Sequence, residues 1–453
     1  MGYYILKSYK FYKDPIFIFE RIKKEKYCFF LDSSLHSNEL GRYSFLGFEP
    51  FFVIKTKGHF PSKDLRSLFN RYKIKLDNFK LPFFGGAVGF LSYDLGFSLE
   101  EKLIPRIPKD LDIPDCFFGF YSSGIIVDHL ASKLYIFSLG FPEKDYLLAK
   151  LLARQNFKKL ERILSEVNFS KSLKFKIKRQ EPISFTSNFT KDQYLEAVKK
   201  AKDYIRKGDI YQVNLSQRFE IKKRIDGFEV YLKLRTLSPS FYSAYLKGED
   251  FEIISSSPEE FLRLKDNLVI TRPMKGTRPR SNNKKKDTLL KKELLNSEKD
   301  KAELIMIVDL ERNDLGRVCR YSSIKVENLR KLEVYSTVFQ TTSTVRGILS
   351  PGKDRFDLIG ACFPGGSITG CPKLRAMQII EELETRRRSI YTGALGYLSF
   401  TGDMNLNILI RTILKKGNKF YFGVGGGIVA DSHPEKEYEE TLVKAKAMLK
   451  SFN

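Results

Sequence analysis

Two pairs of carboxylates in this 453-residue sequence have their members three residues apart. Asp300 and Glu303 lie in KDKAELIMIVDL, and Glu437 and Glu440 lie in EKEYEETLVKAKAML. On a helix, residues three apart share one face, so each pair can be aimed at a single point. Mg²⁺ takes few carboxylates and completes its shell with waters and ligand oxygens, so the spacing is compatible with a magnesium site. The open alternative for Glu440 is an ordinary ion pair with Lys444 one helical turn later.

A single lysine, Lys275, lies between Met274 and Gly276 in TRPMKGTRPR, with three arginines close by at positions 272, 278 and 280. A free lysine has a pKa of about 10.4 and is a poor nucleophile at neutral pH. Burial and neighbouring cations both disfavour the ammonium form, which is how a lysine becomes a nucleophilic amine. The alternative is a surface lysine in a turn.

Two glycine-rich stretches are candidates for binding anions. FPGGSITGCPK (Phe363–Lys373) precedes LRAMQIIEELE, whose periodicity predicts an amphipathic helix, and free amides at a helix start attract anions. GVGGGIV (Gly423–Val429) lies between a strand-like run and the acidic C-terminal segment. Neither stretch matches a P-loop or a dinucleotide fingerprint. The alternatives are a helix-capping turn for the first and a tight turn for the second.

The elements that must position these residues are mixed in type. Short β-branched and aromatic runs predict strands up to about residue 140, at Phe51–Lys55, Gly124–Asp128 and Lys133–Ser138. Helical periodicity marks residues 143–165 and Lys191–Arg206, and a strand follows in YQVNLSQRFEI. Residues 281–290 are predicted as a surface loop. The sequence therefore predicts an α+β fold, a large mixed structure of β-sheets flanked by helices.

Composition narrows the class of protein. The net charge is +25, but the lysines are spread along the chain, and the densest run (282–292) has no interleaved aromatics, which favours a solvated surface over a nucleic-acid groove. No apolar run is long enough to span a membrane. Lysines at positions 7, 10 and 13 interrupt any secretory signal. Five scattered cysteines without CxxC spacing favour free thiols in a reducing compartment, so a cytoplasmic location is expected.

Taken together, the motifs resemble one family, the chorismate-utilising enzymes, and within it component I of anthranilate synthase and of aminodeoxychorismate synthase. The resemblance is carried by DIYQVNLSQRF, SSSPEEF, TRPMKGTRPR, ELIMIVDLERNDLGRV, FPGGSITGCPK, GALGYLSF, MNLNILIRT, GGGIV and YEETLVKAKA, and more weakly by LDSS, GRYSFLG and FFGGAVGFLSYDL. It implies three regions: an N-terminal subdomain (1–166) like that of anthranilate synthase component I, a connector (167–188), and a chorismate-binding catalytic region (189–453).

The resemblance also implies a set of site residues. Glu303 and Glu440 correspond to Mg²⁺ ligands, with Asp300 and Glu437 behind them through water, and Mg²⁺ would hold the ring carboxylate of chorismate. Thr369 is expected near the same end of the substrate. The positions that bind substrate carboxylates are Tyr397, Arg411, Gly425, Gly427 and Lys444.

The reaction is implied by three positions at which family members differ. Lys275 matches the nucleophile of the aminodeoxychorismate type, where anthranilate synthases resemble PIAGT, and Glu259 matches the family's acid/base position. Isochorismate and salicylate synthases use a lysine base where this chain has Gln212, so addition of water is not expected. Many relatives carry a histidine at the position of Gln340, which is tied to the aromatising elimination in anthranilate synthase.

The resemblance therefore predicts amination of chorismate to 4-amino-4-deoxychorismate for p-aminobenzoate and folate synthesis. The alternative is anthranilate formation for tryptophan synthesis. The sequence contains no recognisable glutaminase, so ammonia is expected from a separate glutamine amidotransferase subunit.

Overall fold

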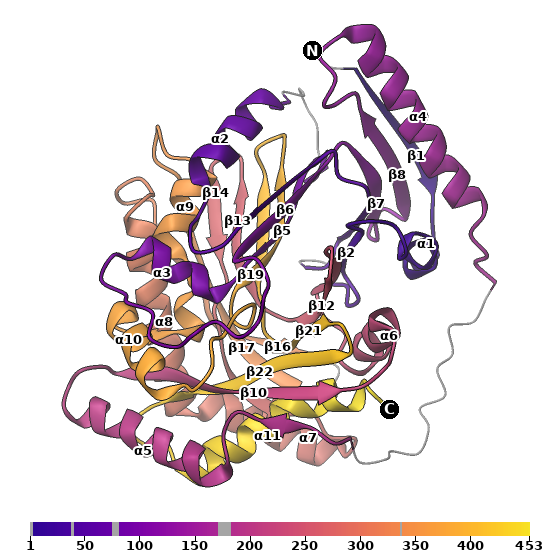
Figure 1. The fold of residues 1–453 in the computed structure, drawn as a ribbon. Coiled ribbons are helices and arrows are strands. Elements are labelled where there is room, and N and C mark those ends of the chain that lie inside the picture. The colour runs from indigo at the N-terminus through magenta and orange to yellow at the C-terminus, as the bar shows by residue number, and fades with distance from the viewer. Residues whose placement is uncertain (1–2, 38–39, 75–80, 171–182, 336–337) are drawn as a thin grey trace.

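The computed structural model describes residues 3–37, 40–74, 81–170, 183–335 and 338–453, which form two large antiparallel β-sheets with helices packed around them (Figure 1). The predicted α+β class is confirmed. Buried aromatic side chains join the inner faces of the sheets. Phe90 and Phe251, one from each sheet, have ring centroids 5.7 Å apart in an edge-to-face arrangement. This mode of contact is favoured because it places the positive edge of one ring on the negative face of another.

The first sheet contains twelve strands in the described residues and is the scaffold for the C-terminal motifs. Its order is β1 (Tyr4–Lys10), β8 (Lys133–Leu139), β7 (Ser123–Asp128), β3 (Tyr43–Gly47), β2 (Phe29–Asp32), β11 (Tyr242–Lys247), β12 (Phe251–Ser257), β21 (Thr412–Lys416), β22 (Lys419–Ile428), β10 (Gln212–Lys222) and β18 (Gly370–Cys371), with β9 (Thr186–Ser187) also on β10.

The second sheet contains ten strands in the described residues and carries the segment with Lys275 at one edge. Its order is β15 (Met274–Pro279), β17 (Val338–Ile348), β14 (Leu268–Thr271), β13 (Glu260–Lys265), β20 (Met404–Ile408), β19 (Ala394–Ser399), β5 (Gly86–Leu91), β6 (Cys116–Tyr121) and β4 (Phe52–Thr56), with β16 (Lys325–Val334) also on β17.

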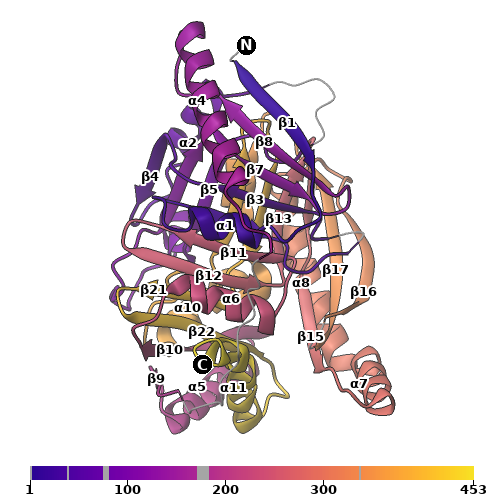
Figure 2. The same ribbon diagram turned by 90° about the vertical axis from the view of Figure 1, so that its right-hand side faces the viewer.

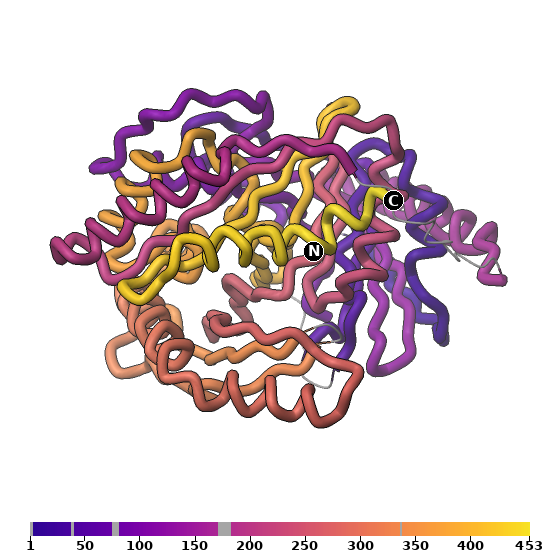
Figure 3. Tube along the Cα trace, turned by 90° about the horizontal axis from the view of Figure 1, so that it is seen from below, coloured from indigo at the N-terminus to yellow at the C-terminus, as the bar shows by residue number. Residues whose placement is uncertain are grey.

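Helices cover the outer surfaces of both sheets. They are α1 (Ile16–Ile22), α2 (Ser62–Arg71), α3 (Gly96–Leu99), α4 (Tyr146–Ser165), α5 (Lys191–Arg206), α6 (Gly227–Leu237), α7 (Lys284–Asn296), α8 (Glu298–Gly316), α9 (Arg355–Cys362), α10 (Lys373–Leu383) and α11 (Pro434–Lys450), with short 3₁₀ turns η1 (Tyr93–Leu95) and η2 (Gly366–Ile368). In the view from below, α11 and α5 run side by side beneath the first sheet (Figure 3). Within the described residues, no helix is long and apolar enough to cross a membrane.

Most of the elements expected from periodicity are present. The helix at Lys191–Arg206 has the predicted bounds, and the expected strands appear as β4, β7, β8 and β10. One prediction and one of the alternatives are wrong. Residues expected as a surface loop form α7, which projects from the body of the molecule (Figure 2). The GVGGGIV stretch lies mostly inside strand β22, so it is not a turn.

The expected three-region division does not correspond to separate sheets. Strand β2 of the N-terminal region pairs with β11, and β5 pairs with β19, so strands before residue 167 complete both sheets. Most of the predicted connector, residues 171–182, lies outside the described residues. Its last residues, Thr186 and Ser187, belong to β9 and pair with β10.

A buried ion pair ties the loop before α10 to strand β10. Arg388 donates to Glu384 at 2.7 Å, and both side chains are almost fully buried. The same guanidinium donates to the carbonyl of Asn214 at 2.6 Å and to that of Ile368 at 2.9 Å. Glu384 also accepts from the Ser216 amide at 2.9 Å. These bonds satisfy buried backbone groups of two segments that meet at the site described below.

Replacing Arg388 should therefore destabilise the whole protein. In Arg388→Met the Glu384 charge stays buried without its partner, so the free energy of unfolding should fall by about 3–5 kcal/mol. Urea denaturation measures the change. Arg375→Gln is the matched control, because the Arg375–Asp209 pair is one-third exposed and should contribute less than about 1 kcal/mol. Equal losses in the two variants would contradict the prediction.

Candidate active site

Lys275 sits on β15 at the edge of the second sheet. The carbonyl of Lys275 accepts from the Thr341 hydroxyl at 2.6 Å, and its ammonium donates to the carbonyl of Ser367 at 3.2 Å. The register between β15 and β17 shifts after Lys275, where Gly276 takes a φ of +71°. Such a left-handed residue is nearly strain-free only for glycine. The bulge interrupts the regular alternation of side chains along β15, and the side chain of Lys275 points towards the first sheet.

The surroundings of Lys275 favour its neutral amine. Burial lowers the pKa of the Lys275 ammonium, and the nearby carboxylates of Glu303 and Glu259 partly oppose that effect. Burial also raises the pKa of the Glu259 carboxyl to about 7, although the Ser367 hydroxyl and the Lys275 charge each lower this pKa. The two groups that sequence analysis assigned as nucleophile and acid are therefore neighbours. The pKa of Lys275 is lowered and that of Glu259 is raised, so both shifts favour the uncharged forms of the two groups.

Two helices bring three of the four predicted metal-ligand carboxylates towards one region. A Cβ placed on Gly426 would be 3.2 Å from Glu437 Oε2 and 3.5 Å from Glu440 Oε1, so these two carboxylates of α11 lie close together. Burial raises the pKa of Glu303 on α8, and the charge of Glu437 adds to the effect. Asp300 is different, because it is hydrogen-bonded to Arg278 at 3.1 Å.

These carboxylates fit Mg²⁺ only together with a ligand. Across the described ranges, no group of three or more ligating side chains is close enough to hold a metal ion by itself. Mg²⁺ is commonly held by one or two carboxylates, while waters and substrate oxygens complete its octahedron. The partly buried Glu303 and the half-exposed Glu440 are suitable donors of this kind.

The glycine run of β22 supplies backbone amides at an open edge. In the described residues, β21 pairs with β22 only through positions 419–421, so the glycines pair on one side alone, with β10. The amide of Ser216, opposite Gly425, binds Glu384, and that of Asn214, opposite Gly427, binds the Thr369 carbonyl. Both are thus non-hydrogen-bonded pairs, in which the opposing backbone groups point away from each other.

The amides of Gly425 and Gly427 consequently face the open edge. Lys444 of α11 reaches this edge and donates to the Gly425 carbonyl at 2.8 Å while pairing with Glu440 at 2.7 Å. At Gly427 a Cβ would be 2.3 Å from the Gln212 amide and 3.4 Å from Lys275 Nζ. Only glycine leaves room there, so the Lys275 amine packs against bare backbone.

Arg411 is a partly buried cation that needs an anion. It lies between β20 and β21 with a left-handed φ of +49°, and burial lowers the pKa of its guanidinium. Among the residues that the structure describes, its guanidinium has no carboxylate partner. Because an unpaired buried charge is costly, an anionic ligand at this position would be stabilised.

The loop before α10 is fixed by its own hydrogen bonds. The buried Thr369 hydroxyl donates to the Gly365 carbonyl at 2.9 Å, and its carbonyl accepts from Asn214. Nearby, both amide atoms of Gln212 and the Asn214 Oδ1 are buried without a hydrogen-bond partner. Buried polar atoms are normally satisfied, so these orphans mark a place where a ligand or water completes the structure.

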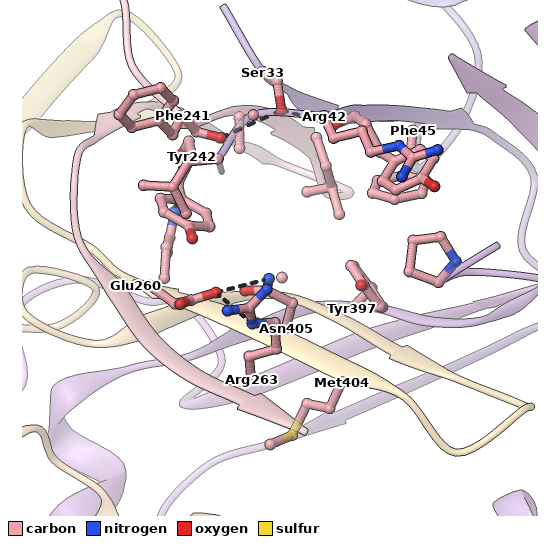
Figure 4. A pocket seen from close by; sticks show the side chains of 18 of the residues that line it. Ser33, Arg42, Phe45, Phe241, Tyr242, Glu260, Arg263, Tyr397, Met404 and Asn405 are labelled. Carbon is pink, nitrogen blue, oxygen red and sulfur yellow. Dashed lines mark hydrogen bonds and ion pairs between the residues drawn. The ribbon is translucent and has the colours of Figure 1, made fainter. Parts of the chain in front are cut away.

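Tyr397 lies away from this centre, which corrects the sequence assignment. It lines a separate cavity of about 240 Å³ with Ser33, Arg42 and Phe45, where the rings of Tyr397 and Phe45 are 5.2 Å apart (Figure 4). The LDSS and GRYSFLG motifs line the same cavity. Glu260 and Arg263 face it as an ion pair, whereas Glu259, one residue earlier, faces Lys275. Successive strand residues point to opposite faces, which separates the two sites.

The tyrosine beside the glycine run is Tyr391, which sequence analysis missed. A Cβ on Gly423 would be only 2.3 Å from its ring. Gly423, Gly425 and Gly427 share one face of β22, so Tyr391 and Lys275 lie at opposite ends of that face. A signal was available in the sequence, since Tyr391 precedes GALGYLSF by only a few residues. Ser367 lies inside the FPGGSITGCPK motif, which did not indicate the roles of its carbonyl and hydroxyl.

Comparisons with known proteins identify the family and the fold. The family model described as chorismate binding enzyme matches residues 28–450. Anthranilate synthase component 1 of Acetivibrio thermocellus is 38% identical, covering 99% of this chain and 94% of that protein. Aminodeoxychorismate synthase component 1 of Bacillus subtilis is also 38% identical, covering 92% and 91%. The crystal structure of anthranilate synthase component I from Streptococcus pneumoniae superposes with a TM-score of 0.78 at 34% identity, covering 92% of this chain and 93% of that one.

The surroundings of Lys275 predict its acid–base behaviour directly. In Mg²⁺-free buffer, competitive acetylation read by peptide mass spectrometry should show Lys275 titrating below the ordinary lysine value, because burial disfavours its charge. Glu303→Gln should lower the pKa further, since the Glu303 carboxylate raises it. Glu298→Gln, an exposed change on the same helix, is the control. A Lys275 pKa unmoved by Glu303→Gln would contradict this geometry.

Proposed function

This chain belongs to the chorismate binding enzyme family, and we propose that it is the synthase component that converts chorismate and ammonia to 4-amino-4-deoxychorismate. Sequence identity does not distinguish aminodeoxychorismate synthesis from anthranilate synthesis, because relatives with either name are 38% identical to this chain. The observation that carries the proposal is the buried Lys275 amine beside Glu259. A nucleophile and an acid placed together serve a substitution in which a hydroxyl must leave.

The reaction follows from these two groups. The neutral Lys275 amine adds to C2 of the ring, the double bond shifts, and the C4–O bond breaks. Hydroxide is a poor leaving group, so Glu259 gives its proton to the departing oxygen, which leaves as water. Ammonia then adds at C4 and the shift reverses, which expels Lys275 from C2. The enolpyruvyl ether stays attached throughout.

The substrate is a dianion, and the site offers donors for two carboxylates. Arg411 supplies a guanidinium without a carboxylate partner in the described residues, while the open-edge amides of Gly425 and Gly427 and the Lys444 ammonium supply further donors. Charge-assisted hydrogen bonds of this type are stronger than neutral ones. We place one substrate carboxylate at this edge and assign Tyr391, in place of Tyr397, to the same end. Thr369 lines the opposite side.

Mg²⁺ is part of the proposal, with Glu303 and Glu440 as its protein ligands. Glu437 lies behind them and is hydrogen-bonded by Ser432 at 2.6 Å, whereas Asp300 is engaged by Arg278. When bound, the ion would neutralise the ring carboxylate and fix its orientation. Raised pKa values at Glu303 and Glu437 are consistent with negative charge that lacks full compensation.

The side-chain amides of Gln212 and Gln340 are unsuited to two other reactions of the family, the addition of water and the loss of pyruvate. Gln212, whose side chain lies against Gly427, cannot serve as a base for adding water. Gln340 pairs with Thr277 across β15 and β17 and donates to its hydroxyl at 3.3 Å. An amide there cannot assist the loss of pyruvate that forms anthranilate. Anthranilate synthesis remains the alternative function, and the product identifies which reaction occurs.

The proposal includes a partner and a compartment. The relatives are named as component 1, which implies a second component. We assign that role to a glutamine amidotransferase that supplies ammonia, in the cytoplasm, for p-aminobenzoate and folate synthesis.

Experiments on Lys275 test the proposed function. Chorismate without ammonia should give a covalent adduct in the intact-protein mass, and with ammonium the product should keep the mass of 4-amino-4-deoxychorismate. Lys275→Ala should lose the adduct and divert residual product towards 2-amino compounds, because ammonia must then attack C2 itself. Anthranilate as the wild-type product would overturn the proposal. Turnover largely preserved in Lys275→Arg would show that the residue only binds charge.

Removing one magnesium ligand tests the metal assignment. Glu303→Gln should reduce turnover by about two orders of magnitude or more while the protein stays folded, because both binding and substrate orientation depend on the ion. Activity is measured against Mg²⁺ concentration, with circular dichroism as the folding check. Glu298→Gln removes the same charge from an exposed position on α8 and should leave the Mg²⁺ dependence unchanged. Near-normal rates in Glu303→Gln at millimolar Mg²⁺ would reject the assignment.

A further inference from the structure

A second buried carboxyl, Glu311, lies behind Glu259 and has no part in the reaction described above. It projects from α8 two turns beyond Glu303, is 7% exposed, and accepts from the Thr271 hydroxyl at 3.0 Å. It lines a small cavity of about 10 Å³ whose other polar side chains are Thr271 and Asp314 and whose remaining walls are mainly apolar. This volume is at the lower limit for one water molecule, whose polar partners would be Thr271, Glu311 and Asp314.

The two carboxyls are enclosed by the same two segments of chain. The Met274 amide and the Ser367 hydroxyl lie near Glu259 and lower the pKa of its carboxyl. Glu311 contacts Thr271, three residues before Met274, and the cavity wall at Gly366, which precedes Ser367. Among the charges around Glu311, that of Glu259 has the largest effect on its pKa. Glu311 therefore lies within reach of the Glu259 charge, and Glu259 in turn lies near Lys275.

Asp314 connects the cavity to the outside. It lines the cavity and also an open groove of about 940 Å³ between α8 and the start of α10. At the groove its carboxylate is paired with Lys373 at 2.6 Å. A row of groups able to carry a proton thus runs from the groove through Asp314, the cavity and Glu311 to Glu259.

The proton balance of the proposed reaction requires such a path. Glu259 gives one proton to the leaving hydroxyl. Ammonia adds at C4 as an ammonium group, and an alkylamine product keeps that proton at neutral pH. Glu259 is therefore left as a carboxylate after each turnover and must take one proton from solvent. Once the substrate fills the site, Glu259 is covered on the side that faces Lys275.

We propose that Glu311 relays a proton from the groove at Asp314 to Glu259, and so restores the acid form of Glu259 after every turnover. This inference rests on the proposed function only in that Glu259 must lose a proton in each cycle. Glu311 acts through Glu259 and does not touch the substrate.

The charges that face the relay support this assignment. Burial raises the pKa of Glu311 well above its ordinary value, Glu259 and Asp314 raise it further, and Thr271 and Lys373 lower it. The balance favours the acid form of Glu311, which carries a proton that it can pass on. Burial also raises the pKa of Asp314, while Lys373 and Arg317 lower it and Glu100 raises it.

The test separates the first turnover from the later ones. Chorismate consumption is followed by rapid mixing with Mg²⁺ and ammonium in Glu311→Gln, which keeps the shape and the Thr271 contact but cannot relay a proton. The first turnover should stay within about twofold of the wild-type rate, since Glu259 is loaded at equilibrium. Later turnovers should slow roughly 10- to 100-fold, within the range that proton transfer contributes. The trace should show a burst of one chorismate per site.

Two further variants complete the design. Glu311→Asp restores a carboxyl and should restore later turnovers, and Asp314→Asn should show the same burst if Glu311→Gln folds poorly. First and later turnovers slowed equally in these variants, or unchanged multiple-turnover rates, would overturn the relay. Chorismate consumption counts turnovers whichever aminated product forms. The burst therefore reports on the relay alone, and product mass reports on the proposed function alone.

Discussion

Withdrawal of the Lys275 amine from water is the constraint on which the rest of the site depends. Removing an ammonium from water is unfavourable, so burial shifts this group towards the neutral amine that the chemistry needs. The surrounding carboxylates oppose the shift, and their distances must therefore be controlled. The bulge at Gly276, the Thr341 contact and the carbonyl of Ser367 fix the side chain between them. Each comes from a different part of the chain.

Strand β22 also helps to keep the Lys275 amine away from water. It has glycines, and therefore no side chains, where the amine packs against it. Its glycines let Lys275 and Gln212 approach one face, let Glu437 and Glu440 approach the other, and leave amides free at the edge. A strand with ordinary side chains would separate these groups by several ångströms. The weak strand propensity of glycine is offset by ten residues of pairing with β10. The Arg388–Glu384 pair then holds β10 in place from behind.

The sequence predicted elements with clear periodicity and residues within dense motifs. It placed Lys275, Glu259, Glu303 and Glu440 in segments that the fold brings together. It failed at β22, because a glycine run reads as a turn until its partner strand is known. It failed at α7, where no apolar stripe marks the helix and an Asn283 cap starts it. Tyr391 and Tyr397 are six residues apart, and only the alternation of β19 shows which cavity Tyr397 faces. Glu311 and the orphaned Gln212 amide are properties of packing, which no local pattern records.

The pairing of β2 with β11 has a consequence for synthesis on the ribosome. Leu31 finds its partner Ala244 more than two hundred residues later in the chain. At about 5–20 residues per second, the N-terminal strands wait roughly 10–40 s beside the ribosome with an unpaired sheet edge. Such an edge can pair with other nascent chains. The edge of β2 that pairs with β11 therefore stays open until more than half of the chain has been synthesised.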